Sequence, residues 1–406
     1  MLRLPNGQAF MTRPFRRRIL YIPGYDPLPP RRYRETFRSE GATQAMLSGY
    51  RLQMGPRGDA TGFGWGVRGD FPEGRSECDF EVLVWSDIVQ GSMGHGILAT
   101  YGQMLRTAAI YLGSGALWRM TRLRRGPVLA ALYPVAVLLA QLLLALALGG
   151  IAGGLLASLT GLGLWVSLPV AGVLAWALLR LFRRADSRFM AWYLMHDFAF
   201  IASGAGAWPP ALDRRLDQFA ARLGQVLRQD WDEILVVGHS TGACLAVSAV
   251  ARAMKDAPKD ARLSLLTLGQ VVPMMSFLPR ARGLRRDLRS LSINRQVDWV
   301  DVSAPGDPCC FGLCDPVAVS GVRPPQAHQP LILSAAFSRS LSRARLQALR
   351  GRWLRIHFQY LCAFDRPQGY DYFAITAGPL PLARRYRDRS HSPGRIDRPV
   401  SPWTTT

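Results

Sequence analysis

The segment best suited to catalysis is Gly238-His239-Ser240-Thr241-Gly242, which has the pattern G-x-S-x-G. In this pattern, a tight turn between a strand and a helix exposes the serine hydroxyl as a nucleophile. The flanking residues are compatible with such a turn. Residues 234–237 form a short, β-branched apolar run typical of a buried parallel strand, and 243–251 are small or apolar without a helix breaker. The sequence therefore predicts that Ser240 is a nucleophile.

The strand, turn and helix around Ser240 resemble those of the α/β-hydrolase superfamily, particularly its lipase and esterase branches. Pro23-Gly24-Tyr25, which follows an early apolar run, adds to this resemblance. The resemblance implies a catalytic triad in the chain order Ser, Asp or Glu, His. In such a triad the histidine takes the proton of the serine, and the acid orients the histidine.

The acid is expected just after a strand downstream of Ser240. Asp307 fits best, because the expected strand at 297–302 is followed by a Pro/Gly turn that ends at this residue. Asp315 is the second candidate, because it is also followed by a proline, in Asp315-Pro316-Val317. Asp301 is a third candidate, but it lies inside the expected strand. All three could instead only cap turns.

The base is expected after the acid, which leaves His328, His357 and His391. His357 is favoured because it follows the expected strand 331–337 and has apolar neighbours to fix it. His328 precedes that strand, and His391 falls in a segment expected to be mobile. The alternative for His357 is a satisfied histidine of the core.

The remaining histidines are assigned other positions. His95 and His196 precede the serine motif and are interpreted as structural, and His239 is expected to line the site.

The oxyanion of the tetrahedral intermediate needs preorganised N–H donors. One is expected from the backbone of Thr241, and the other from Gly24 or Tyr25, because Pro23 has no N–H. The superfamily often has His-Gly at the second position, whereas this chain has Pro-Gly. A plain turn at 23–27 is the alternative.

A long hydrocarbon segment lies between these motifs. Residues 127–179 contain no charged residue and no histidine, which is too long for one membrane span of about 20 residues. We therefore expect two transmembrane helices, at about 128–150 and 158–181, joined at the glycines between them. Arginines flank both outer ends, so the positive-inside rule predicts a two-pass topology with both termini and the catalytic domain in the cytoplasm, in a bacterial cytoplasmic membrane.

The rest of the chain alternates apolar runs with helical patterns, which predicts a mostly parallel α/β sheet of the α/β-hydrolase type. We expect one domain at 15–380, interrupted at 100–200 by the insertion with the hairpin. An extension at 1–14 precedes it, and a disordered basic tail at 384–406 follows. The expected strands lie at 18–22, 62–67, 80–85, 234–237, 263–268, 297–302, 331–337 and 370–377, and helices are expected at 32–52 and 213–228.

Composition restricts the class of partner. The formal net charge is +22, but no RNP, zinc-finger or aromatic-arginine signature accompanies it, so we expect no nucleic acid. The six cysteines include Cys309, Cys310 and Cys314, which lack a second pair or a nearby histidine, so no metal and no cofactor are expected.

These predictions combine into a membrane-anchored serine hydrolase that cleaves carboxylic esters, including lipid acyl esters, through an acyl-enzyme. The expected partners are the lipid bilayer and an amphiphilic acyl ester. Acyl transfer would use the same residues. The alternative function is an inactive α/β-hydrolase fold that acts as a membrane scaffold or binds a partner protein.

Overall fold

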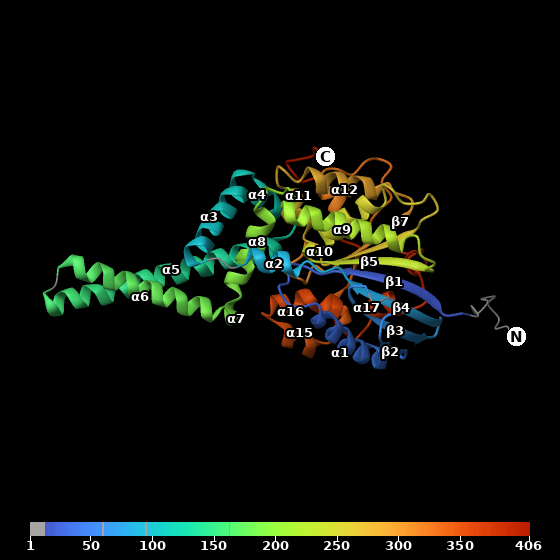
Figure 1. Cartoon of the computed structure of the whole chain (residues 1–406), viewed down its shortest axis with the longest axis horizontal. Helices are drawn as coiled ribbons and strands as arrows, with labels where there is room; N and C mark the ends of the chain where they lie inside the picture. Colours follow the sequence, from blue (N-terminus) through green and yellow to red (C-terminus); the bar gives the residue numbers. More distant parts are fainter. Residues whose placement is uncertain (1–12, 59–60, 94–95, 162) are drawn as a thin grey trace.

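The architecture is a three-layer α/β domain from which a helical hairpin projects (Figure 1). The computed structural model describes residues 13–406 apart from 59–60, 94–95 and 162. Its eight strands form one sheet in the order β2-β3-β4-β1-β5-β6-β7-β8. The strands are β1 (Phe15–Ile22), β2 (Arg51–Gly55), β3 (Phe63–Phe71), β4 (Gly74–Val82), β5 (Glu233–His239), β6 (Leu263–Leu268), β7 (Val297–Ser303) and β8 (Leu331–Ser334).

The sheet is mostly parallel, which confirms the predicted fold class at this level. Strand β1 pairs in parallel with β4 on one side and with β5 on the other, and β5 to β8 continue in parallel. Only β2, β3 and β4 pair antiparallel. The strand order therefore reverses between β1 and β5, and ligands of such sheets bind outside the carboxyl ends of the strands at this reversal.

Helices cover both faces of the sheet (Figure 1). Alternating residues of β5 enter two separate cores: Val236 packs into one and Val237 into the other. One face is covered by α9 (Pro210–Val226), α10 (Thr241–Ala253), α11 (Val272–Ser276) and α12 (Arg282–Ser292). The other is covered by α1 (Arg31–Ser48), α15 (Arg343–Leu349), α16 (Trp353–His357) and α17 (Tyr372–Ala377). This burial on both faces explains why the central strands β5 and β6 are almost continuously apolar.

The remaining helices lie in loops and around the base of the hairpin. They are α2 (Ser86–Ser92), α3 (Ile97–Gly113), α4 (Ala116–Thr121), α7 (Asp186–Phe189), α8 (Ala191–Ala202), α13 (Pro316–Val319), α14 (Phe337–Ser340), the 3₁₀ helix η1 (Phe358–Leu361) and α18 (Leu382–Arg385).

The hairpin consists of α5 (Arg125–Thr160) and α6 (Leu164–Arg184), and both helices are long and apolar enough to cross a membrane. At 1.5 Å per residue, α5 is about 54 Å long. Its first part belongs to the domain, where the hydroxyl of Tyr101 donates to the carbonyl of Leu138 and the indole of Trp192 donates to Gln141 at 3.1 Å. Farther along, α5 projects with α6 away from the sheet (Figure 1).

The glycines in the middle of the apolar segment do not form the expected turn. The chain reverses between Thr160 and Leu164, where Gly161 ends α5 in the left-handed conformation. Gly149 and Gly153 instead lie at the contact between the two helices. A Cβ atom at either glycine would lie 2.5 or 2.7 Å from a backbone oxygen of α6. Small residues that allow close helix approach are typical of membrane helix pairs.

Two predictions near the carboxyl terminus are wrong. Residues 370–377 do not close the sheet, because 372–377 form helix α17, whose first N–H groups are capped by Asp371. The tail at 384–406 is not disordered either. Ile396 pairs with Cys314, and the N–H of Val400 donates to Val319 at 3.1 Å, so the tail packs along the domain as an extended segment. Its many arginines and prolines resemble a disordered composition, but a few apolar residues anchor it.

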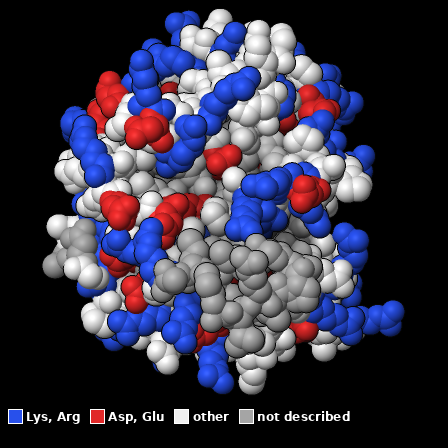
Figure 2. Space-filling model, turned by 90° about the vertical axis from the view of Figure 1, so that its right-hand side faces the viewer, with Lys and Arg blue, Asp and Glu red and all other residues white. Residues whose placement is uncertain are grey.

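Basic side chains lie both on the surface and in the interior of the domain. Figure 2 shows the end of the molecule opposite the hairpin, where basic side chains are distributed around the outline with acidic ones between them. Arg17 and Arg18, at the amino end of β1, are instead fully buried. Arg17 contacts Glu233 at 2.6 Å, and Arg18 contacts Asp79 at 2.7 Å. These two arginines therefore tie the central strand to its neighbours.

Some predictions fall outside the described residues. Most of the expected extension at 1–14 and His95 belong to them. The six cysteines are all described, and all are free thiols.

Candidate active site

Ser240 occupies a strained turn between β5 and α10. Its backbone has φ 58° and ψ −126°, a conformation that L residues rarely adopt. Close packing holds the turn in place. A Cβ atom on Gly242 would lie 2.3 Å from the carbonyl oxygen of Ile22, and one on Gly238 would lie 2.6 Å from the carbonyl oxygen of Gly242. The two glycines of the motif are therefore required by contacts with β1 and α10, and the turn presents Ser240 at the carboxyl end of the sheet.

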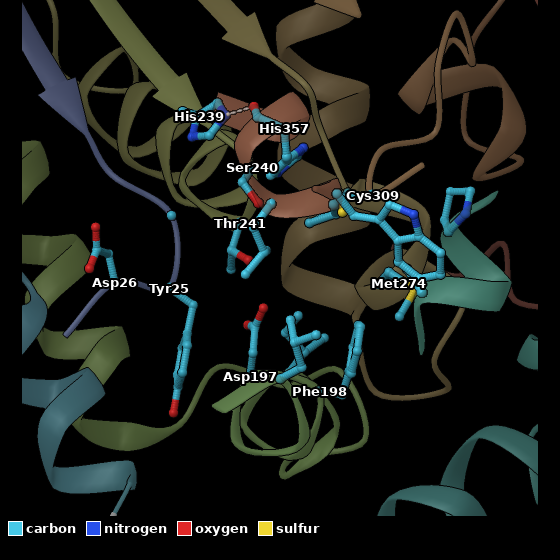
Figure 3. Close-up of a pocket in the computed structure, with 18 of the residues that line it drawn as sticks. Tyr25, Asp26, Asp197, Phe198, His239, Ser240, Thr241, Met274, Cys309 and His357 are labelled. Carbon is cyan, nitrogen blue, oxygen red and sulfur yellow. Dashed lines mark hydrogen bonds between the residues drawn. The ribbon is translucent and has the colours of Figure 1, made fainter. Parts of the chain in front are cut away.

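Asp307 and His357 meet beside Ser240. Asp307 lies in the loop after β7 and His357 ends α16, and the Nδ1 of His357 lies 2.7 Å from Oδ2 of Asp307. His357 and Ser240 line the same pocket (Figure 3). With Nδ1 donating to Asp307, the Nε2 atom of His357 is the one free to accept a proton. No hydrogen bond of the described chain engages the Ser240 hydroxyl.

Asp307 is kept ionised by its contacts. Burial alone would raise the pKa of this carboxyl, but the charge and hydrogen bond of His357 hold the pKa below its ordinary value. The backbone N–H of Cys309 also donates to Oδ1 at 2.9 Å, and the hydroxyl of Tyr360 donates to Oδ2 at 3.1 Å. Such a carboxylate can orient a histidine and stabilise its protonated form.

The other candidates for acid and base have structural positions. Asp301 points into the sheet and accepts from the hydroxyl of Thr267 at 2.6 Å. Asp315 caps α13 and pairs with Arg323 at 2.8 Å. His328 is exposed, and the ring of His391 accepts from the N–H of Ile332 at 3.1 Å. The structure therefore brings Asp307 and His357 to Ser240, and none of these four.

His239 has a role that the sequence did not predict. Its ring is buried, and its Nε2 donates to the carbonyl oxygen of His357 at 2.9 Å (Figure 3). Burial is the main cause, and repulsion from His357 the second, that lowers the pKa of His239 to about 3, so the ring is neutral. His239 therefore fixes the backbone that carries His357. Its place inside the serine motif was the only signal in the sequence.

Sequence reasoning also missed Tyr360, because its hydrogen-bond partners are distant in sequence. Its hydroxyl donates to Asp307 and accepts from the N–H of Ala304 at 2.9 Å. It therefore fixes both the acid and the loop that carries it.

The backbone N–H groups expected to form the oxyanion hole are available. Within the described residues, no chain acceptor bonds to the N–H of Thr241, Gly24 or Tyr25. A Cβ atom on Gly24 would lie 3.0 Å from that of Ser240, so this loop passes directly beside the serine. Other groups fix the loop: Trp85 donates to the carbonyl of Pro23 at 2.9 Å.

The walls of the pocket come from the hairpin base and from α8 and α16. Pro127 and Ala130 belong to α5, Tyr193 and Asp197 to α8, and Trp353 to α16. The helix that continues into the projecting hairpin thus borders the space in front of Ser240.

The cluster does not fit a metal site. Asp307, Cys309 and His357 have ligand atoms within 4.8 Å of one another. However, Asp307 and His357 are hydrogen-bonded to each other, and burial together with the charge of Asp307 raises the pKa of the Cys309 thiol. A protonated thiol is a poor metal ligand. These donors are better explained as an acid–base pair with a neutral thiol beside it.

Comparisons with known proteins give no further guide to the chain. No protein-family model, no curated protein and no solved structure matches it.

Proposed function

We propose that this protein is a serine hydrolase that cleaves carboxylic esters through a covalent acyl-enzyme. The observation that carries the proposal is the Asp307–His357 pair beside Ser240, which lies in a strained strand-to-helix turn. Nucleophile, base and acid follow the chain order of the α/β-hydrolase superfamily, and we propose that the chain is a distant member of it. The ordered acid–base pair favours an enzyme over an inactive scaffold, because a scaffold has no use for it.

The proposed reaction has two steps. The Nε2 of His357 takes the proton of Ser240 as Oγ attacks the acyl carbonyl, and Asp307 stabilises the charged ring. The N–H groups of Thr241 and of the Gly24–Tyr25 loop stabilise the oxyanion. His357 then protonates the departing alcohol. Water, deprotonated by the same ring, hydrolyses the acyl-enzyme and regenerates Ser240.

The hairpin supports a location at a membrane. The exposed apolar side chains of α5 and α6 would be unfavourable in water, and the hairpin base borders the pocket. We propose that the hairpin anchors the enzyme in the bilayer, with the pocket at the cytoplasmic surface, where an amphiphilic acyl ester can enter.

The proposal is tested by labelling membranes of expressing cells with a fluorophosphonate, which reacts with activated serines. We expect labelling of the wild type and none of Ser240→Ala. Ser248→Ala is a matched control, because Ser248 is buried in α10 and bonds to Asp287 at 2.6 Å, away from the pocket. Equal labelling of Ser240→Ala and wild type would refute a nucleophilic Ser240.

A further inference from the structure

The pocket in front of Ser240 is rich in aromatic side chains, and no lysine or arginine is among its described lining residues. The described residues that line it include no lysine or arginine, although the chain contains 50 of them. Five lining residues have six-membered or indole rings: Tyr25, Tyr193, Phe198, Trp353 and Phe358. Aromatic rings attract cations through their quadrupoles and offer nothing comparable to anions.

Asp197 brings a carboxyl group into this pocket. It extends from α8, and its oxygens point toward the side of the pocket formed by Ser240 and Thr241 (Figure 3). Its Oδ1 atom is buried and has no hydrogen-bond partner. A buried polar atom without a partner is rare in proteins, because its desolvation is not compensated. A group that enters the pocket can provide the missing partner.

The other acids at the site are already paired. Asp26 also lines the pocket, but it contacts Arg32 at 2.9 Å and accepts from the hydroxyl of Tyr33 at 2.7 Å. Asp307 is bonded to His357. Among the described residues that line the pocket, Asp197 is thus the carboxyl group without a chain partner.

An ionised Asp197 has a consequence for the proposed reaction. Negative charge develops on the acyl oxygen beside Thr241, and a second negative charge facing it would oppose the step. A cation placed between the two charges removes this conflict. The described lining residues include no lysine or arginine, and the positive charge that forms on His357 is held by Asp307, so a cation carried by the substrate fits this position.

We propose that Asp197 determines specificity by binding a positively charged nitrogen of the substrate, which the aromatic rings surround. The substrate class is an ester that carries an ammonium group close to the scissile bond. This inference rests on the proposed function for the reaction, although the binding site can be tested without it.

The first test compares two butyrate esters of the same shape, using the purified full-length protein in lipid nanodiscs. One is the choline ester, and the other is its neutral isostere, 3,3-dimethylbutyl butyrate. We expect wild-type kcat/KM to favour the charged ester by about tenfold or more, as desolvated cation–aromatic and charge contacts allow. In Asp197→Asn, the ratio between the esters should approach one.

The matched control is Asp230→Asn, because Asp230 is exposed and lies far from the pocket residues in the fold. This variant should keep the wild-type ratio. An equal kcat/KM for both esters in the wild type, or an unchanged preference in Asp197→Asn, would overturn the proposal. The ratio is internal to each protein sample, so partial misfolding does not imitate the result.

The second test measures binding without catalysis. Benzyltrimethylammonium is titrated calorimetrically into Ser240→Ala and into the double variant with Asp197→Asn. We expect the Kd to rise about tenfold in the double variant. If this holds while the wild type hydrolyses neither ester, the inference stands and the proposed function fails. If hydrolysis depends on Ser240 but binding ignores Asp197, only the inference fails.

Discussion

Two aspartates near Ser240 are driven toward opposite protonation states. His357 and a backbone N–H hold the pKa of Asp307 below its ordinary value. Burial without a partner raises the pKa of Asp197 to about 7. Environments that push the pKa values of neighbouring acids apart are typical of sites that assign them different tasks. Here the tasks we propose are orientation of the base for Asp307 and recognition of the substrate for Asp197.

Removing either member of the acid–base pair should nearly abolish turnover. We expect His357→Ala and Asp307→Asn each to lower kcat by about 10³-fold or more, because the serine loses its proton acceptor or the histidine its orientation. The measurement is hydrolysis of a short-chain ester by protein in nanodiscs. Asp301→Asn is the control for Asp307, since Asp301 is buried in the sheet and bonds to Thr267. Full activity of either variant would disprove that assignment.

Asp197 should make stability depend on pH. The pKa is 3.8 in the unfolded chain and about 7 in the folded protein, so folding favours the protonated form. The contribution of Asp197 to the free energy of unfolding is therefore fully present below about pH 4, and it is lost as the pH rises through about 7. Asp197→Asn should therefore unfold at a higher temperature than wild type near pH 8, and at a similar temperature near pH 4.

Other groups around Asp197 do not titrate in a way that hides this effect. Burial raises the pKa values of Tyr25, Tyr193 and Cys309, so these side chains stay neutral in this range. A difference in unfolding temperature that is the same at both pH values would contradict the expected protonation of Asp197.

At the scale of elements, the site depends on how closely α10 approaches β1. Gly242→Ala should destabilise the fold by about 2 kcal/mol or more, since the added methyl group would meet the backbone oxygens of Ile22, at the end of β1, and of Pro23 after it. Gly224→Ala in α9 is the matched control, because nothing lies within 4 Å of its Cβ position. That change should stabilise the helix by about 0.5–1 kcal/mol. Denaturant unfolding followed by circular dichroism distinguishes the two outcomes.

The hairpin helices should respond to side-chain size on one face only. Gly149→Leu should separate α5 from α6, because its Cβ would lie 2.5 Å from the carbonyl oxygen of Ala171. Gly150→Leu, one residue away, has open space at the same position and should be tolerated. Distances between spin labels on the two helices report the separation. If both variants move the helices equally, the close contact at Gly149 is wrong.

At the scale of the molecule, the site and the hairpin lie at the same end. The carboxyl ends of the parallel strands carry Ser240 and the Gly24 loop, and α5 borders their pocket before it continues outward (Figure 1). This arrangement supports our proposal that the hairpin holds the domain close to the surface of a bilayer.

The orientation can be tested with single cysteines and a membrane-impermeant maleimide on intact cells. Leu159→Cys lies near the hairpin turn and Met46→Cys on α1, and the native residues are 83% and 79% exposed, respectively. We expect labelling of the first in intact cells and of the second only after permeabilisation. The unmodified protein controls for its own thiols. Labelling of Met46→Cys in intact cells would place the catalytic domain outside the cytoplasm.

The sequence alone determined what depends on neighbours along the chain. The apolar runs predicted the positions of six strands to within four residues, as at 263–268, because a buried strand needs an unbroken apolar stretch. The run at 80–85 matched only the carboxyl end of β4 (Gly74–Val82). The serine motif predicted its own turn, since bulk at Gly238 or Gly242 would meet backbone atoms. The uncharged length of 127–179 predicted two helices long enough for a membrane.

Only the tertiary structure decided what depends on residues distant in sequence. The hydrogen bonds of His239 and Tyr360 span more than 50 residues, and the partnerless state of Asp197 depends on α8 facing the sheet across the pocket. Glycines occur both in turns and at close helix contacts. The sequence therefore could not show that Gly149 lies at the contact between α5 and α6, whereas Gly161 ends α5 at the turn. The docked tail and helix α17 depend in the same way on partners elsewhere in the fold. Local patterns determine the elements, because their physics is local. The proposed site, and the specificity that we propose for it, depend on the packing of distant elements, which decides which polar groups find a partner.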